Sequence, residues 1–95
     1  MTEAELLASV VEACRQLRLL CYHTADSRRS AAGFPDLVIV GRGGVLFREL
    51  KSASRLSRAQ SDWITALVRA GQSATVWRPE HWPEPIWTEL RAIAR

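Results

Sequence analysis

Two short apolar runs joined by glycines limit most strongly what this chain can fold into. The runs are DLVIV at 36–40 and VLFRELK at 45–51, and GRGG lies between them. Both runs are rich in the β-branched and aromatic residues that favour strands, and glycine provides the positive φ angles that hairpin turns use. The pattern predicts an antiparallel hairpin with strands at 36–40 and 45–51.

The charged side chains of this apolar hairpin include Asp36, Glu49 and Lys51. Successive side chains of a strand face opposite sides, so Glu49 and Lys51 share one face. The hairpin brings the start of its first strand near the end of its second strand, which places Asp36 close to Glu49. We therefore expect two carboxylates and one ammonium group to converge at one end of the sheet.

This group of side chains suits a divalent metal ion. Mg²⁺ prefers carboxylates, carbonyls and waters, and the backbone carbonyl of Leu50 could join Asp36 and Glu49 as a ligand. Near a phosphodiester, such an ion lowers the pKa of a bound water, and Lys51 could orient that water or stabilise the charge that develops on the phosphate. The residues thus fit phosphodiester hydrolysis. The structural alternative is that Asp36 only enters a strand after Pro35 and that Glu49 and Lys51 form a surface ion pair.

Periodicity and capping signals predict the helices. Apolar residues at three- and four-residue spacing over residues 3–20 follow a capping box of Thr2 and Glu5. A second capping box, formed by Ser57 and Gln60, begins a helix that Gly71 ends. Prolines delay a last helix to about residues 85–94.

Two further strands complete the expected sheet. Residues 19–23 follow the first helix as a strand, and 74–77 follow the second helix. The right-handed crossover rule makes the 74–77 strand parallel to 45–51. The predicted fold class is α/β, a mixed β-sheet flanked by helices in the order α-β-β-β-α-β-α.

Length, cysteines and hydropathy exclude several classes of protein. Ninety-five residues support one domain, 1–95, with one core. Cys14 and Cys21 lack metal-site spacing, so we expect reduced thiols and no zinc site. No apolar run approaches about 18 residues and the first residues are acidic, which favours a soluble cytoplasmic protein without a membrane partner.

Positive charge is concentrated around the hairpin. The segment 28–58 has seven basic and two acidic residues, whereas 59–95 is balanced and 1–27 is acidic. Such a distribution favours an anionic partner such as a nucleic-acid backbone. The residues that we expect to contact phosphates are Ser27, Arg28, Arg29, Ser30, Arg55 and Arg58. The alternative for 27–30 is an ordinary solvated loop.

Three motifs resemble a known family. GFPD at 33–36, ELK at 49–51 and LSRAQ at 56–60 are similar to the VRR-NUC branch of the PD-(D/E)XK nucleases, in its short stand-alone form often found in phages and bacteria. The resemblance implies a restriction-endonuclease-like core that cuts DNA with Mg²⁺ or Mn²⁺. It also implies that Asp36 and Glu49 hold the metal and that Lys51 is catalytic.

The resemblance implies two further site residues. Gln60 would face the site from the second helix, and a glutamate of the first helix would join it. Glu5 fits the usual position of that glutamate better, and Glu12, seven residues on, stays open as the alternative.

Stand-alone members of this branch are similar to archaeal Holliday-junction resolvases, which act as dimers. The resulting hypothesis is a structure-selective endodeoxyribonuclease, a four-way-junction resolvase that acts as a homodimer. Trp82 and Trp87 are the expected dimer residues, while Trp63 and Trp77 are expected in the core. The alternatives are a flap, nick or general DNA nuclease that works with a helicase, or a DNA-binding module without catalysis.

Overall fold

The computed structural model describes residues 1–24 and 31–95. A four-stranded sheet forms its centre, with β1 (Leu20–His23), β2 (Leu37–Gly41), β3 (Gly44–Leu50) and β4 (Ser73–Trp77) in the spatial order β1-β2-β3-β4. β2 is antiparallel to both of its neighbours, β1 and β3, and β4 is parallel to β3. The order α-β-β-β-α-β-α is confirmed, with a short 3₁₀ helix, η1 (Pro79–His81), added before the last helix.

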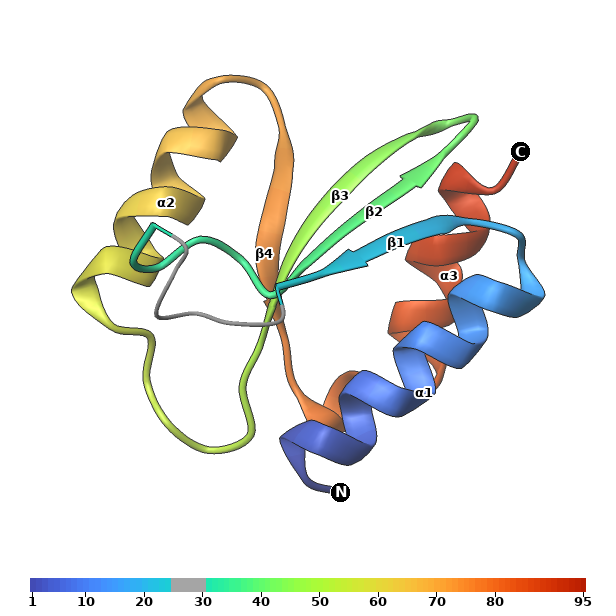
Figure 1. Cartoon of the computed structure of the whole chain (residues 1–95), viewed down its shortest axis with the longest axis horizontal. Helices are drawn as coiled ribbons and strands as arrows, with labels where there is room; N and C mark the ends of the chain where they lie inside the picture. The colour runs from blue at the N-terminus through green and yellow to red at the C-terminus, as the bar shows by residue number, and fades with distance from the viewer. Residues whose placement is uncertain (25–30) are drawn as a thin grey trace.

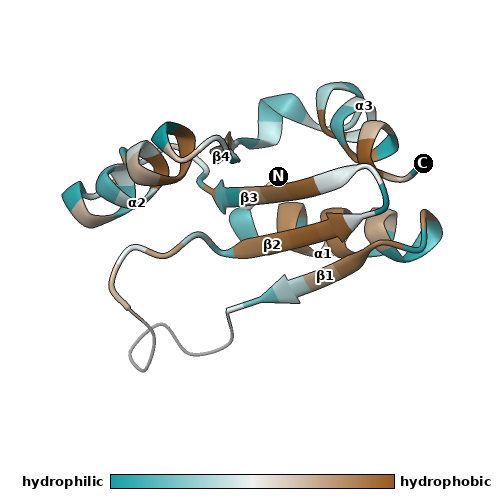
Figure 2. Ribbon diagram, turned by 90° about the horizontal axis from the view of Figure 1, so that it is seen from above, coloured by the Kyte–Doolittle hydropathy of each residue, from teal (hydrophilic) through white to brown (hydrophobic). Residues whose placement is uncertain are grey.

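The helices lie on both sides of the sheet. Figure 1 shows α1 (Glu3–Gln16) and α3 (Glu84–Ile93) together on one side, and α2 (Arg58–Arg69) on the other side next to β4. In Figure 2 the apolar parts of β2 and β3 lie above α1, where the core forms. The core is built from alternate strand residues and from one apolar stripe each of α1 and α3. Its members include Leu6, Val10, Cys14, Leu37, Ile39, Leu46, Leu50, Trp77, Ile86 and Leu90. None of the helices in the described parts of the chain has both the length and the apolar character needed to cross a bilayer.

The first helix is shorter than its periodicity predicts. It ends at Gln16, and Arg18 adopts a left-handed conformation with a φ of 57°. Arg18 N–H donates to the Arg15 carbonyl and Leu19 N–H donates to the Cys14 carbonyl, which is the hydrogen-bond pattern of a Schellman motif. Glycine usually occupies this position, so the arginine hides the helix end in the sequence.

The hairpin forms as predicted, but its glycines act differently. Gly41 pairs with Gly44, so Arg42 and Gly43 form a two-residue loop. Of these glycines, Gly44 has a positive φ, of 153°. Gly41 is needed for close packing, because a Cβ there would lie 2.0 Å from the carbonyl oxygen of Ile93 in α3. The glycine run therefore fixes the hairpin tip against the end of α3 as well as turning the chain.

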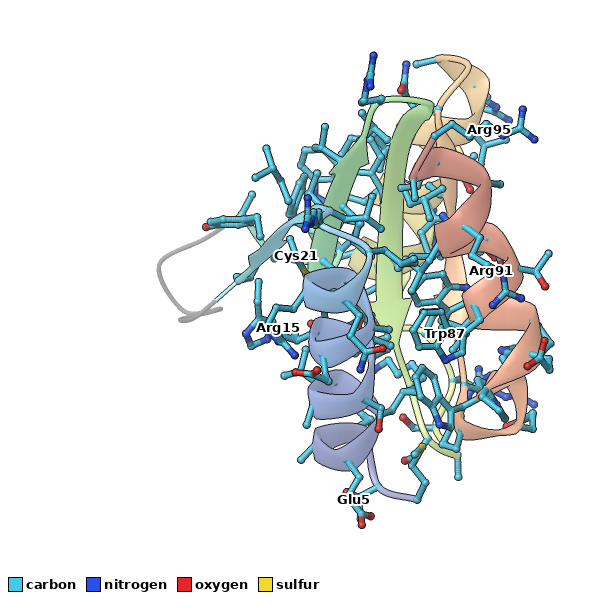
Figure 3. The ribbon with its side chains drawn as sticks, turned by 90° about the vertical axis from the view of Figure 1, so that its right-hand side faces the viewer. Glu5, Arg15, Cys21, Trp87, Arg91 and Arg95 are labelled. Carbon is cyan, nitrogen blue, oxygen red and sulfur yellow. The ribbon has the colours of Figure 1, made fainter. Side chains whose placement is uncertain are left out.

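The tryptophans, two of which are the expected dimer residues, differ in burial. Trp77 is 1% exposed in the core, as predicted. Trp82 and Trp87 are half-buried against the core, with ring centroids 6.2 Å apart, and Figure 3 shows Trp87 beside the sheet. Both indoles thus bury part of their surface against the core of this chain. The large exposed apolar side chains lie elsewhere, at Leu20, Tyr22 and Val40 on the outer face of β1 and β2 among other positions.

Candidate active site

The register of the hairpin places Asp36 opposite Glu49. Leu37 pairs with Arg48, so the next step of the ladder sets Asp36 across from Glu49 with both side chains on one face. The ladder stops there because the following pair would join Pro35 with Leu50, and proline has no N–H to donate. Leu50 N–H donates instead to Asp36 Oδ2, at 2.9 Å. The Asp36 carboxylate therefore lies at the open end between β2 and β3.

Pro35 also affects the Leu50 carbonyl. In an antiparallel ladder this oxygen would accept a hydrogen bond from the residue opposite it. Pro35 cannot provide that bond, so β2 leaves the oxygen available to another partner. The predicted third metal ligand thus lies beside the two predicted carboxylates and is not used by the neighbouring strand.

Glu49 is a buried acid. Its side chain is 4% exposed, and Oε2 accepts a hydrogen bond of 3.0 Å from Gln60 Nε2. Within the described part of the chain, Oε1 has no hydrogen-bond partner. Burial, followed by the nearby charge of Asp36, raises the pKa of this carboxyl to about 8. An unpaired buried carboxylate oxygen next to a second carboxylate is a costly arrangement that a bound cation would relieve.

Gln60 connects the second helix to the site. Its side-chain Oε1 accepts from the backbone N–H of Ser57 at 2.9 Å, and the backbone N–H of Gln60 donates to Ser57 Oγ at 3.1 Å. These two bonds complete the predicted capping box. Because the carbonyl end of the amide is used by the helix cap, the amide nitrogen must point towards Glu49. One side chain therefore both begins α2 and orients the buried carboxylate.

Lys51 completes the group at the strand end. It is half-buried, its N–H donates to the Trp77 carbonyl at 3.1 Å, and its charge acts to lower the pKa of Glu49. It is also the only lysine among thirteen basic residues in the 95-residue sequence. Arginine keeps its charge at any physiological pH, whereas lysine can change its proton content. The single lysine of the chain thus lies beside the two facing carboxylates.

The loop before Asp36 packs tightly onto α2. A Cβ on Gly33, whose φ is +86°, would lie 2.4 Å from the backbone carbon of Ala59. Phe34 contacts Trp63 and Phe47 edge-on, with centroid separations of 5.1 and 6.4 Å. Trp63 Nε1 donates to the Ala32 carbonyl at 3.1 Å. These contacts hold the segment that delivers Asp36 to the site.

The structure places the first-helix glutamates differently from one another. Glu5 is exposed and its carboxylate accepts from Thr2 N–H at 2.8 Å, and Figure 3 shows it projecting from the N-terminal end of α1. Glu12 is exposed and paired with Arg15. Glu3, which the sequence reasoning missed, lines a pocket beside Asp36. The pocket residues are Glu3, Ala4, Leu7, His23, Asp36 and Leu50.

A usable signal for Glu3 was present in the sequence. Glu3 lies four residues before Leu7 and seven before Val10, so it shares the helix face that the apolar stripe turns towards the sheet. Its Oε2 accepts from Ser52 N–H at 3.2 Å, just after Lys51 in the chain. Glu3 is therefore the first-helix carboxylate that the fold brings to the site, whereas Glu5 serves the helix cap.

The predicted DNA-contacting residues are only partly described. Ser27, Arg28, Arg29 and Ser30 lie outside the described residues. Arg55 is exposed on the segment that connects β3 to α2. Arg58 is exposed at the start of α2, and its Nε lies 3.3 Å from Asp62 Oδ1. The basic segment after Lys51 is thus accessible next to the carboxylates.

The oxygen atoms at this strand end fit a hard divalent cation. In residues 1–24 and 31–95 no group of three or more His, Cys, Asp or Glu side chains gathers around one point. The site instead offers Asp36, Glu49 and the Leu50 carbonyl. Mg²⁺ and Mn²⁺ commonly bind through one or two carboxylates and complete their shell with water and substrate oxygens. This donor set excludes the sulfur and imidazole ligands of a structural zinc site.

Two solved structures are similar to this chain in fold. A VRR_NUC domain protein matches over 82% of this chain and 78% of its own, with a TM-score of 0.63 and 26% sequence identity. Hjc from Archaeoglobus fulgidus, a Holliday junction resolvase from an archaeal hyperthermophile, matches over 81% of this chain and 65% of its own, with a TM-score of 0.53 and 24% identity. No family model and no curated protein sequence matches this sequence. The chain has the restriction-endonuclease-like fold, and its resemblance to the VRR-NUC nuclease domain is confirmed.

Proposed function

We propose that residues 1–95 form a nuclease domain that hydrolyses phosphodiester bonds in DNA with the help of Mg²⁺ or Mn²⁺. The observation that carries this proposal is the buried Glu49 carboxylate, which has an unpaired Oε1 and lies opposite Asp36. A small domain gains no stability from an acid in that position, so the arrangement is best explained by a ligand.

Each site residue has a distinct task in this proposal. Asp36, Glu49 and the Leu50 carbonyl would hold the cation, which supplies Lewis-acid activation of water and of the phosphoryl oxygen. Lys51 stabilises the charge that develops on the phosphate during attack. Gln60 keeps Glu49 oriented through its amide, an outer contact of the kind that tunes metal affinity. Glu3 adds a carboxylate at the rim, where it can orient water.

The proposed substrate is branched DNA, with a four-way junction as the first choice. The basic segment 28–58 supports a nucleic-acid partner, and the fold is shared with a protein described as a Holliday junction resolvase. Paired cuts on such a substrate require two active sites, because one small site reaches one strand at a time. A homodimer is therefore part of the proposal.

The outer face of β1 and β2 supports the dimer. Leu20 is 72% exposed, Tyr22 is 60% exposed and Val40 is 37% exposed, and they share one face because Leu20 pairs with Val40. The variant Leu20→Lys places a charge on this face, and we expect it to sediment as a monomer where the parent protein forms a dimer. Val68→Lys is the matched control, because Val68 is another exposed apolar residue, 53% exposed, but lies on α2. Equal sedimentation of the parent and Leu20→Lys would remove this surface from the proposal.

Incision of labelled DNA tests the activity. The parent protein should cut a four-way junction in the presence of Mn²⁺ and should leave it intact in EDTA. Asp36→Ala and Lys51→Ala should lose incision by at least a hundredfold while they still bind the junction, and Glu80→Gln should cut like the parent because Glu80 is an exposed acid in η1. Full activity in Asp36→Ala or Lys51→Ala would refute the site. A duplex and a flap of the same sequence, tested at one salt concentration, would show whether the preference is for junctions.

A further inference from the structure

Arg78 continues the line of site residues onto the next strand. The parallel register pairs Glu49 with Val76 and Leu50 with Trp77, so the next step sets Arg78 beside Lys51. The Lys51 N–H bond to the Trp77 carbonyl shows that the two strand ends stay paired up to this point. Neighbouring residues in register have their side chains on the same face. The guanidinium therefore leaves the sheet on the face of Lys51.

One nitrogen of this guanidinium holds the loop that follows Lys51. Nη1 donates to the carbonyl of Ser52 at 3.3 Å and to that of Ser54 at 3.1 Å. From the opposite side, Ser52 N–H and Oγ donate to Glu3 Oε2 at 3.2 and 3.3 Å. The loop 52–54 is thus held between Arg78, just after β4, and Glu3 of α1. The same hydrogen bonds restrict the Arg78 side chain.

The rest of the guanidinium remains available to a ligand. Arginine has five N–H donors, and in the described part of the chain the partners of this side chain use Nη1 alone. Nε and one N–H of Nη2 form the parallel pair of donors that matches two oxygens of one phosphate. The side chain also has no carboxylate partner within residues 1–24 and 31–95, so its charge is not compensated by an ion pair.

Charge and order distinguish Arg78 from the other basic residues. The segment 51–58 contributes Lys51, Arg55 and Arg58 and contains no acid, so the surroundings attract phosphate. Arg55 and Arg58 are exposed and must lose rotamer freedom when they bind, whereas half-buried Arg78 is already held by two carbonyls. A prepositioned cation costs less conformational entropy on binding.

We propose that Arg78 binds a phosphate of the DNA backbone beside the bond to be cut, through Nε and Nη2, while Nη1 positions the loop after Lys51. This inference rests on the proposed function for the identity of the ligand as DNA. It adds a residue that lies outside all three sequence motifs and directly follows β4 instead of belonging to the hairpin.

Salt-dependent binding tests the phosphate contact. Arg78→Gln and the control Arg69→Gln remove the same charge, and Arg69 ends α2, whereas the site lies at the start of that helix. Binding of a fluorescent four-way junction would be measured in EDTA between 50 and 200 mM NaCl, which separates binding from incision. Loss of one phosphate contact should reduce the slope of log affinity against log salt by about 1. We expect this change, with about tenfold weaker binding, in Arg78→Gln only; equal slopes and affinities in the two variants would overturn the inference.

Arg78→Lys separates the charge from the geometry. A lysine keeps the positive charge but cannot donate to two carbonyls and to a phosphate from fixed directions. We expect Arg78→Lys to keep the parent salt slope and to cut at least tenfold more slowly at saturating junction with Mn²⁺. An unchanged incision rate at saturation would overturn the positioning part of the inference.

A measurement on the parent protein covers the case in which Arg78→Gln does not fold. The Nε–H signal of Arg78 in an NMR spectrum can be assigned by its absence from Arg78→Lys. It should shift when the junction is added in EDTA, and a signal that stays in place would overturn the inference. If the parent binds the junction through Arg78 but never cuts, the proposed nuclease activity fails and the phosphate contact stands. If the parent protein cuts the junction and Arg78→Gln binds it like Arg69→Gln, the proposed nuclease activity stands and the phosphate contact fails.

Discussion

Replacing Glu49 by glutamine should abolish incision and at the same time stabilise the protein at alkaline pH. The amide has almost the same shape as the carboxyl, and its carbonyl can still accept the hydrogen bond from Gln60. It cannot ionise, so it avoids placing a negative charge in a buried position opposite Asp36. The substitution therefore separates what the carboxylate does for catalysis from what it costs the fold.

The pKa of Glu49 gives the size and sign of the effect. It is raised from 4.5 to about 8, first by burial and then by the charge of Asp36. Between about pH 4.5 and pH 8 the folded protein thus holds a proton that the unfolded chain has lost, and the free energy of unfolding falls as the pH rises through this range. At about 1.4 kcal/mol for each tenfold change in proton affinity, the upper limit is roughly 5 kcal/mol. Water that enters the open strand end screens the charge, so we expect about 1 to 3 kcal/mol.

Urea denaturation followed by tryptophan fluorescence measures this difference. In the absence of divalent cations, the parent and Glu49→Gln should unfold alike near pH 5, and the variant should be more stable by the expected 1 to 3 kcal/mol at pH 9. Glu80→Gln is the control, because it makes the same chemical change at an exposed acid outside the site. Other titrating groups cancel when each variant is compared with the parent at the same pH.

The refuting result is a difference that does not change with pH, or a variant that is less stable than the parent at pH 9. Mg²⁺ provides a second check at pH 9. A cation that binds the folded state should restore the stability of the parent protein and leave Glu49→Gln unchanged. Equal stabilisation of both proteins by Mg²⁺ would mean that the cation binds elsewhere.

Three further predictions concern the parts of the site. Gly33→Ala should lose about 2 kcal/mol or more in urea denaturation because its Cβ would collide with the Ala59 backbone, whereas Gly71→Ala, with a similar φ of +87° but open space around it, should lose only about 1 kcal/mol. Gln60→Glu should keep the helix cap and place a carboxylate against Glu49. With a pKa of about 8, Glu49 is protonated at pH 6 and can donate to that carboxylate, so thermal stability should change little there, while Mn²⁺-dependent incision should fall about tenfold or more. Acetylation of amines should stop incision, and activity should be lost at the rate at which Lys51, the single lysine, is acetylated, as followed by mass spectrometry. Protein that is acetylated at Lys51 and still cuts would exclude a role for the Lys51 charge.

The hairpin and the facing of its charges could be predicted because both depend on local rules. Strand alternation fixes which side chains share a face, and a two-residue loop fixes the register, so Asp36 and Glu49 had to meet. The two capping boxes likewise depend on residues three positions apart, and both form. Gly71 ends α2 with a positive φ as expected, because little else in the neighbourhood competes with that conformation.

The features that the sequence did not reveal depend on contacts between distant segments. The end of α1 at Gln16 uses an arginine where glycine is usual, so no local signal marks it. Glu3 was missed because the family resemblance favoured Glu5, although the helix face could have separated them. Trp82 and Trp87 were expected at an interface, but they pack against the core of their own chain, which only the placement of α3 determines.

Pro35 explains why the proposed cation site lies at this end of the sheet and not at the other. At the hairpin tip the ladder closes with Gly41 opposite Gly44, and the backbone groups pair with each other. At the open end the proline has no N–H, so the Leu50 carbonyl loses its partner on β2, and Leu50 N–H donates to the Asp36 carboxylate. The residue that cannot donate a hydrogen bond therefore frees an oxygen beside the acid that Leu50 N–H anchors. The Pro-Asp pair thus acts through the backbone as much as through the aspartate, and the buried Glu49 then sets the charge that this end of the sheet must neutralise.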